Sequence, residues 1–137
     1  MRLATEEILG DKVAALDAAR SGLPGHYNLD LLDDPVCGRA LKFYLMLTEM
    51  PQLIADLGLS AEEVFWSRYY WLRRYAKLRE ATLGQDAGLE QQASQMLDHP
   101  DPPCDPDWSE LEILEARAER DVAAQLGTVP DGRADLP

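Results

Sequence analysis

The sequence predicts an all-α protein, a compact bundle of five to six helices with a proline-rich linker before the last helix. Apolar residues recur at helical spacing, no segment alternates as a strand does, and helix caps and glycine or proline stops divide the chain. A length of 137 residues with 46% apolar content is enough for a single core. The expected organisation is a helical bundle domain at 1–98, a linker at 99–107, an acidic helix at 108–126 and a disordered tail at 127–137.

The first predicted helix runs from Glu6 to Arg20 and is capped by Thr5. Gly10 weakens this helix, because glycine loses more backbone entropy on ordering than any other residue. The turn sequence SGLPG, at 21–25, ends it. Its apolar residues at helical spacing are Ile8, Leu9, Val13 and Leu16.

The second predicted helix follows the segment HYNLDLLDDP, at 26–35, which we expect to be irregular or a short turn. Asp34 is a good N-cap, and Pro35 suits the first helical position. The helix then extends to about Glu49 and is apolar on nearly every side, as expected of a helix in the middle of a bundle. This apolar run contains Leu41, Phe43, Tyr44, Leu45, Met46 and Leu47.

Two more helices follow without a long break. Pro51 starts a shorter helix, PQLIADLG, which Gly58 closes. Residues 60–63, Ser-Ala-Glu-Glu, have the form of a capping box, in which the serine side chain bonds the third amide and the last glutamate reaches back. This box opens the longest helix, from Ala61 to about Leu83.

The C-terminal third is predicted to be helical on both sides of a proline-rich segment. A polar helix is expected at Leu89–Asp98. The four prolines of HPDPPCDPD, at 99–107, forbid a helix and favour an extended linker. Asp107 or Ser109 then caps a last helix that ends at Leu126.

Charge is distributed unevenly along a chain whose net charge is −12. Residues 1–61 carry −4, residues 62–85 carry +2 and residues 86–137 carry −10. Phosphate binding needs clustered positive charge, which the rest of this field would oppose. We therefore expect no direct nucleic-acid binding. The acidic surface would instead keep the protein soluble, dock on a basic protein or mimic DNA.

The sequence predicts a cytoplasmic protein with no membrane contact. No apolar run approaches the ~20 residues that span a bilayer, and glutamates interrupt the N-terminal segment MRLATEEILGDK where a secretion signal needs a continuous apolar run. Cys37 and Cys104 are expected to be free thiols in a reducing compartment. Together with His26 and His99 they lack the close spacing of a zinc site.

No catalytic or cofactor motif is found in the chain. A Gly-rich phosphate loop, a G-x-S-x-G elbow and an H-E-x-x-H pair are all missing from the sequence. Glu112, Glu115 and Glu119 have a spacing that could ligate metal in a di-iron bundle, but neither histidine forms the Glu-x-x-His pair that such sites need. We expect a solvated charged face there, with no metal, no cofactor and no enzymatic activity.

The longest helix carries an unusual concentration of aromatic and basic residues. Its stretch FWSRYYWLRRYAKLR, at 65–79, holds six of the ten aromatic residues of the chain and five of its thirteen basic ones. On a helical wheel, two neighbouring stripes are predicted to be core, buried against the helices at 35–49 and 51–57. These stripes are Phe65, Tyr69, Leu72 and Ala76, and Val64, Trp71, Tyr75 and Leu78.

The opposite side of this helix is the predicted partner-binding face. Trp66, Tyr70, Arg73 and Lys77 align along it, with Arg74 alongside. Large rings mixed with cations are enriched in protein interfaces. The partner is either another chain or the last helix of the protein itself. In the second case, the apolar partners would be Trp108, Leu111, Ile113 and Leu114, and the charged ones Glu112, Glu115 and Glu119.

The start of the same helix resembles a motif of a phage protein family. Ser60-Ala61-Glu62, Trp66, Tyr69-Tyr70 and Leu72 form S-A-E-x-x-x-W-x-x-Y-Y-x-L, after the apolar turn LIADLGL. This pattern is similar to one in the tail assembly proteins of long-tailed phages, the minor tail protein T group. That family usually continues with Glu-Pro, whereas this chain continues as a helix. The resemblance implies a small cytoplasmic adaptor, a tail assembly chaperone that holds tape-measure or tube subunits before assembly.

The sequence therefore supports two functional hypotheses. The first is a non-enzymatic helical protein-binding adaptor, possibly a phage tail assembly chaperone, which uses the face of aromatic and basic residues. The second is an acidic inhibitor that occupies a basic or nucleic-acid-binding surface of a partner, based on the −10 charge of the C-terminal third.

Overall fold

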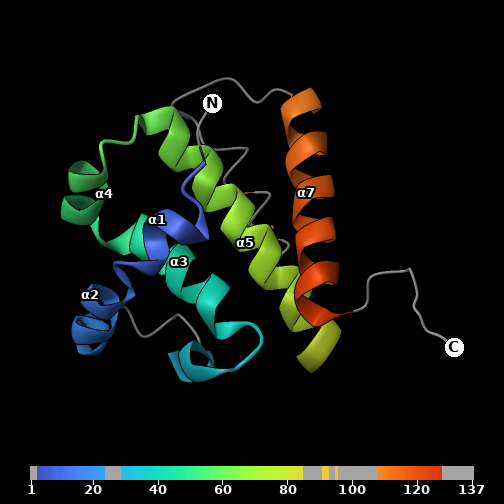
Figure 1. Cartoon of the computed structure of the whole chain (residues 1–137), viewed down its shortest axis with the longest axis horizontal. Helices are drawn as coiled ribbons and strands as arrows, with labels where there is room; N and C mark the ends of the chain where they lie inside the picture. The colour runs from blue at the N-terminus through green and yellow to red at the C-terminus, as the bar shows by residue number, and fades with distance from the viewer. Residues whose placement is uncertain (1–2, 24–28, 85–90, 93–94, 96–107, 128–137) are drawn as a thin grey trace, which may run out of the picture.

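The computed structural model describes residues 3–23, 29–84, 91–92, 95 and 108–127, and it confirms the all-α prediction. No strand occurs in these ranges. The longest helix, α5, lies at the centre, with α3 and the short helices on one side and α7 on the other (Figure 1). The helices are α1 (Glu6–Gly10), α2 (Val13–Ala18), α3 (Gly38–Glu49), α4 (Pro51–Leu57), α5 (Ala61–Leu83) and α7 (Trp108–Leu126), with 3-10 helices η1 (Arg20–Gly22) and η2 (Leu29–Asp33).

Some predicted elements fall largely outside the described residues. Of the expected helix at Leu89–Asp98, only residues 91, 92 and 95 are described, and they are helical. The expected linker at 99–107 lies outside, as does the expected tail from residue 128 onward. None of the described helices is both long and apolar enough to cross a membrane.

The predicted boundaries between α4 and α5 are confirmed. Gly58 follows α4 with a φ of 69°, in the left-handed region that glycine adopts without steric cost. At the start of α5, the Ser60 hydroxyl accepts a hydrogen bond from the Glu63 amide at 3.1 Å, and the Glu63 carboxylate accepts one from the Ser60 amide at 2.9 Å. This capping box supplies partners for two amides that the helix itself leaves unpaired.

The prediction of a single N-terminal helix from Glu6 to Arg20 is wrong. The chain instead forms α1, a turn at Asp11 and Lys12, α2 and then η1. Thr5 occupies the N-cap position, but its side chain makes no capping hydrogen bond. Leu9 in α1 and Leu16 in α2 are both fully buried. The break directly follows Gly10, the last residue of α1, where the low helical propensity of glycine favours an end to the helix.

The helix predicted from Pro35 begins three residues later, at Gly38. Asp34 still supplies the expected carboxylate, which accepts hydrogen bonds from the amides of Val36 and Cys37 at 3.0 and 2.9 Å. These bonds lower the pKa of Asp34, mainly through the Cys37 amide. Asp34 therefore caps a turn that leads into α3 rather than the helix itself.

The core forms where α3 packs on α5. The Phe43 and Trp71 rings meet edge to face, and their centroids are 4.7 Å apart. Both predicted stripes of α5 lie inward, although Val64 is only partly buried. The N-terminal segment is fixed to the same helix, because Ser67 accepts a hydrogen bond from the Ala4 amide at 2.9 Å and the Trp71 indole donates one to the Ala4 carbonyl at 2.8 Å. Residues 67 and 71, one helical turn apart, thus bind both the amide and the carbonyl of Ala4.

Gly38 allows α3 to approach η2 closely, which leads to the first prediction. A Cβ at residue 38 would lie 2.5 Å from the Leu32 carbonyl oxygen and 2.8 Å from that of Leu31. Because both atoms belong to the backbone, no rotamer change relieves the overlap. Gly38→Ala is expected to lower the free energy of unfolding by about 2 kcal/mol or more, measured by urea denaturation.

The matched control is Gly22→Ala, since a Cβ at residue 22 meets nothing within 4 Å. Its unfolding free energy should stay within about 0.5 kcal/mol of the wild-type value. Equal stability of the two variants would contradict the close approach of α3 and η2.

Candidate protein-binding face on α5

The structure places most of the predicted face of α5 against α7. We call this set the aromatic-basic face: Trp66, Tyr70, Arg73, Arg74 and Lys77. Trp66 and Tyr70 are buried, with exposed fractions of 2% and 4%, and the three cations are partly buried. Four of the five side chains hydrogen-bond or form ion pairs with α7, whereas Trp66 is buried with its ring against the edges of Phe65 and Tyr69.

Tyr70 is the centre of a polar network between the two helices. Its hydroxyl donates a short hydrogen bond to the Asp121 carboxylate and accepts one from Arg74 at 3.1 Å. The Arg117 guanidinium lies over the Tyr70 ring, 5.6 Å from its centroid. Burial, followed by the hydrogen bond to Asp121, raises the pKa of Tyr70 to about 12. The phenol therefore stays protonated at neutral pH and serves as a donor to α7.

Two ion pairs differ in how well they join the helices. Arg73 Nε lies 2.6 Å from a carboxylate oxygen of Glu115, and the exposed fractions of the two side chains are 14% and 37%. Lys77 Nζ lies 3.9 Å from Glu119, whose side chain is 77% exposed. A charged hydrogen bond with restricted solvent access is stronger than a long exposed ion pair. The ion pair of Arg73 and Glu115 is therefore the stronger of the two.

Arg74 connects the centre of the bundle to the end of α7. Its guanidinium lies over the Trp71 indole, 4.9 Å from the ring centroid, and donates to the Gln125 side chain at 3.0 Å. The Arg74 Nε is buried and has no hydrogen-bond partner. Gln125 in turn donates to the Val36 carbonyl at 2.7 Å, before α3. This chain of contacts fixes the C-terminal end of α7 on the bundle.

A narrow apolar stripe on α7 faces α5. Its buried residues recur at i, i+3, i+7 and i+11, the spacing of a two-helix seam. They are Leu111, Leu114, Ala118 and Val122. The predictions for Leu111 and Leu114 are consistent with this arrangement, but that for Ile113 is wrong: Ile113 is 59% exposed, because it lies about 160° around the helix from Leu111. The side chain of Trp108 lies outside the described residues.

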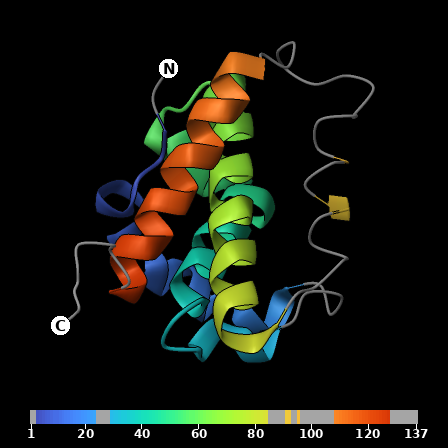
Figure 2. The same ribbon diagram turned by 90° about the vertical axis from the view of Figure 1, so that its right-hand side faces the viewer.

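The two helices run in the same direction. Figures 1 and 2 show the first residues of α5 and of α7 at the same end of the pair. The contacts agree with this direction. Arg73 bonds Glu115, and Lys77, one turn after Arg73, pairs with Glu119, which is one turn after Glu115. A parallel pair cannot be a hairpin, so the contact between α5 and α7 depends on side-chain complementarity rather than on a short connection.

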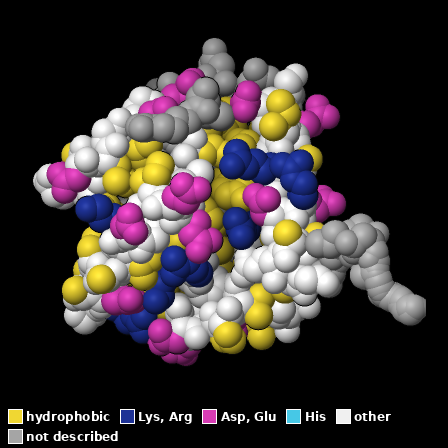
Figure 3. Space-filling view, in the orientation of Figure 1, with side chains coloured by type: hydrophobic (Ala, Val, Ile, Leu, Met, Phe, Trp, Pro, Cys, Tyr) yellow, Lys and Arg dark blue, Asp and Glu magenta, His cyan; other side chains and the backbone are white. Residues whose placement is uncertain are grey.

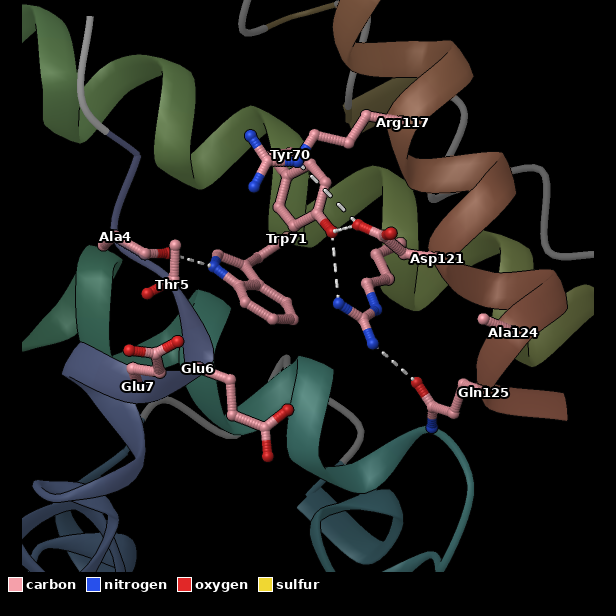
Figure 4. A pocket seen from close by; sticks show the side chains of 11 residues that line it. Ala4, Thr5, Glu6, Glu7, Tyr70, Trp71, Arg117, Asp121, Ala124 and Gln125 are labelled. Carbon is pink, nitrogen blue, oxygen red and sulfur yellow. Dashed lines mark hydrogen bonds and ion pairs between the residues drawn. The ribbon is translucent and has the colours of Figure 1, made fainter.

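A pocket of about 510 Å³ opens beside this contact, between α5, α7 and the N-terminal segment. Figure 3 shows hydrophobic side chains at the bottom of a hollow on this side of the molecule, with basic side chains at its edge. Trp71, Tyr70 and Asp121 lie in the pocket wall (Figure 4). Their polar atoms bond to Ala4, Arg74 or one another, so the pocket wall is an ordered network that spans three segments of the chain.

The predicted free thiol at Cys37 is buried. It donates to the Asp34 carboxylate at 3.3 Å, and burial raises its pKa to about 12, so it is a protonated, unreactive thiol at neutral pH. The other three residues considered for zinc, His26, His99 and Cys104, lie outside the described residues. In the part of the chain that the structure describes, no three His, Cys, Asp or Glu side chains form a cluster that could hold a metal.

Comparisons with protein-family models, curated proteins and solved structures found no match for the chain. The residues of the tail-protein motif have structural roles: Ser60 caps α5, and Trp66, Tyr69, Tyr70 and Leu72 are buried.

Sequence reasoning missed several residues of α7 that contact α5 or support the contact. These are Arg117, Ala118, Asp121, Val122 and Gln125. A seven-residue repeat was available as a signal, since residues 111, 118 and 125 are spaced by seven, as are 114 and 121. The repeat is inconspicuous because alanine, aspartate and glutamine occupy three of the five positions.

The second prediction compares two residues of the aromatic-basic face. Trp66→Ala should lower the free energy of unfolding by about 3–5 kcal/mol, because it leaves a large cavity in a buried region. Lys77→Ala should lower it by only about 0–1 kcal/mol, because its ion pair is long and its partner is exposed. Urea denaturation at pH 7 measures both changes in the unfolding free energy. A Trp66→Ala variant as stable as wild type would show that this stripe is ordinary surface.

The third prediction concerns the Tyr70 hydroxyl. Tyr70→Phe should lower the unfolding free energy at pH 8 by about 1–3 kcal/mol, because it removes the donor from Asp121. Tyr70 titrates near pH 10 in the unfolded chain and near 12 in the folded protein. The hydroxyl's contribution is therefore fully present below pH 10 and is lost as the pH rises toward 12.

Denaturation of both proteins across pH 8–12 measures this effect, since other titrating groups cancel in the difference. The difference in unfolding free energy between wild type and Tyr70→Phe should narrow above pH 10. A gap that is constant across the series would contradict the hydrogen bond between the Tyr70 phenol and Asp121.

Proposed function

We propose that the chain is a non-enzymatic helical adaptor that binds a protein partner through the aromatic-basic face of α5. The observation that carries the proposal is the composition of this face: two large rings and three cations gathered on one stripe of a chain whose net charge is −12. Trp, Tyr and Arg are the residues that most often dominate binding energy at protein interfaces. The contact with α7 supports the proposal, because it demonstrates what kind of surface complements this face.

The resemblance at residues 60–72 narrows the proposed partner. A tail assembly chaperone would hold tape-measure or tube subunits of a long-tailed phage before they assemble. The size of the chain, its all-α fold and its acidic charge are compatible with such a role. We therefore propose tail assembly as the specific setting of the adaptor.

The acidic inhibitor is the second candidate and has less support. Within α7 there are five acidic residues and two arginines, and Glu115 and Asp121 are engaged with α5. The exposed acids Glu112 and Glu119 share the helix with Arg120, which is exposed as well. The described part of the C-terminal third thus offers little unneutralised acid for a basic partner.

The fourth prediction tests the adaptor with a charge swap. The double variant Arg73→Glu/Glu115→Arg keeps an ion pair between α5 and α7, so its melting temperature should stay near that of wild type. It reverses the charge that a partner would meet on α5. When the chain is co-produced with the tape-measure and tube subunits of the same genome, wild type should retain a subunit that the double variant loses.

Glu112→Gln is the matched control, since Glu112 is exposed on the other side of α7. It should retain the subunit as wild type does, and calorimetry with purified components should give the same order. Retention by the double variant at wild-type affinity would exclude the aromatic-basic face as the partner site. If neither subunit binds wild type, the tail assembly assignment is wrong.

A further inference from the structure

The contact between α7 and α5 has the features of a bound ligand helix. Its described contacts are chiefly with α5, which it meets through one stripe, while its other side is exposed at Glu112, Ile113 and Ala116. An amphipathic helix that lays one apolar stripe into a complementary groove is a common mode of peptide recognition. Here the receiving surface is the α5 face that α7 covers, which we call the groove, and it belongs to the same chain as the helix.

The chemistry of the contact defines which helix the groove accepts. Two leucines and a valine supply apolar area, and the small Ala118, which is fully buried, lets the helix axes approach. Glu115 meets Arg73, and Asp121 meets Tyr70. Relative to Leu111 at i, the pattern is apolar at i, i+3 and i+11, small at i+7 and acidic at i+4 and i+10.

We infer that the aromatic-basic face of α5 binds an amphipathic acidic helix of a partner protein, parallel to α5 and with the residue pattern of α7, and that α7 competes with it for the same groove. This inference rests on the proposed adaptor function and names the partner's chemistry. Charge complementarity favours such a helix, since residues 62–85 carry +2 in an otherwise acidic chain. Because α7 is covalently attached, its effective concentration is in the millimolar range or higher, and it lowers the apparent affinity of the partner.

A labelled peptide in place of the partner tests the inference. The probe is a fluorescein-labelled synthetic peptide of residues 108–126, titrated with the full chain and followed by fluorescence anisotropy. In the full-chain variant Leu114→Asp, a charge replaces a buried leucine and opposes docking of the attached α7. This opened chain should bind the peptide at least tenfold more tightly than wild type does.

Matched peptides establish the pattern. A peptide with Glu112→Gln, changed on the exposed side, should bind the opened chain as the parent does, whereas a peptide with Leu114→Asp should not bind. A peptide with Glu115→Arg should bind poorly to the opened chain and recover when that chain also carries Arg73→Glu. Where Leu114→Asp does not fold, as judged by circular dichroism, Glu115→Lys is the opened chain, because it sets a lysine against Arg73 and leaves the apolar stripe intact.

Three outcomes would overturn the inference. A folded, opened chain that binds no peptide, or that binds the parent and the Leu114→Asp peptides equally, has no helix groove at this face. A wild-type chain that is dimeric by light scattering through exchanged α7 helices assigns the groove to a second copy. The failure of the adaptor function is distinguishable, since a phage subunit retained by a chain that binds no peptide leaves the adaptor intact and moves its site elsewhere.

Discussion

Burial of α5 on two sides is the constraint on which the rest of the structure depends. The helix carries aromatic or apolar residues around nearly its whole circumference, so it cannot lie on a surface. On one side Trp71 packs on Phe43 of α3 and, with Ser67, holds the backbone of Ala4. On the other side Tyr70 is covered by α7. α3 and α7 cover these two sides, while α1, α2, α4 and η2 pack mainly on α3.

Local chemistry explains which parts of the fold could be predicted from sequence. The boundary between α4 and α5 was predictable, because Gly58 and the pair Ser60 and Glu63 act on amides and carbonyls within three residues of themselves. The split of the N-terminal helix was predictable only in part, because Gly10 marks a weak point in the helix but does not by itself show that the chain turns there. At the start of α3, Gly38 lies close to the backbone of Leu31 and Leu32 in η2, a contact that a residue pattern does not reveal.

The candidate site was predictable on α5 and only in part on α7. The α5 face is marked by large rings and cations whose spacing is plain in the sequence. The matching side of α7 has a small residue, Ala118, at its centre, so its apolar stripe is less conspicuous in the sequence than the rings of α5. Ile113 is apolar by residue type, but it lies about 160° around the helix from Leu111 and is exposed. The backbone contacts of Ser67 and Trp71 with Ala4 leave no trace in a residue pattern at all.

The composition of the α5–α7 contact also explains why the same face can serve a partner. If the contact were made only of leucine and phenylalanine, loss of α7 would expose a surface that aggregates. Arg73, Arg74 and Lys77 instead carry charges that water solvates as soon as α7 leaves, and their long stems shield part of the neighbouring rings. The Tyr70 hydroxyl likewise exchanges Asp121 for water. On the adaptor proposal, this polar border keeps the uncovered face soluble, while the Tyr70 ring and the apolar stripe of the docking helix supply the area that makes rebinding of a helix favourable.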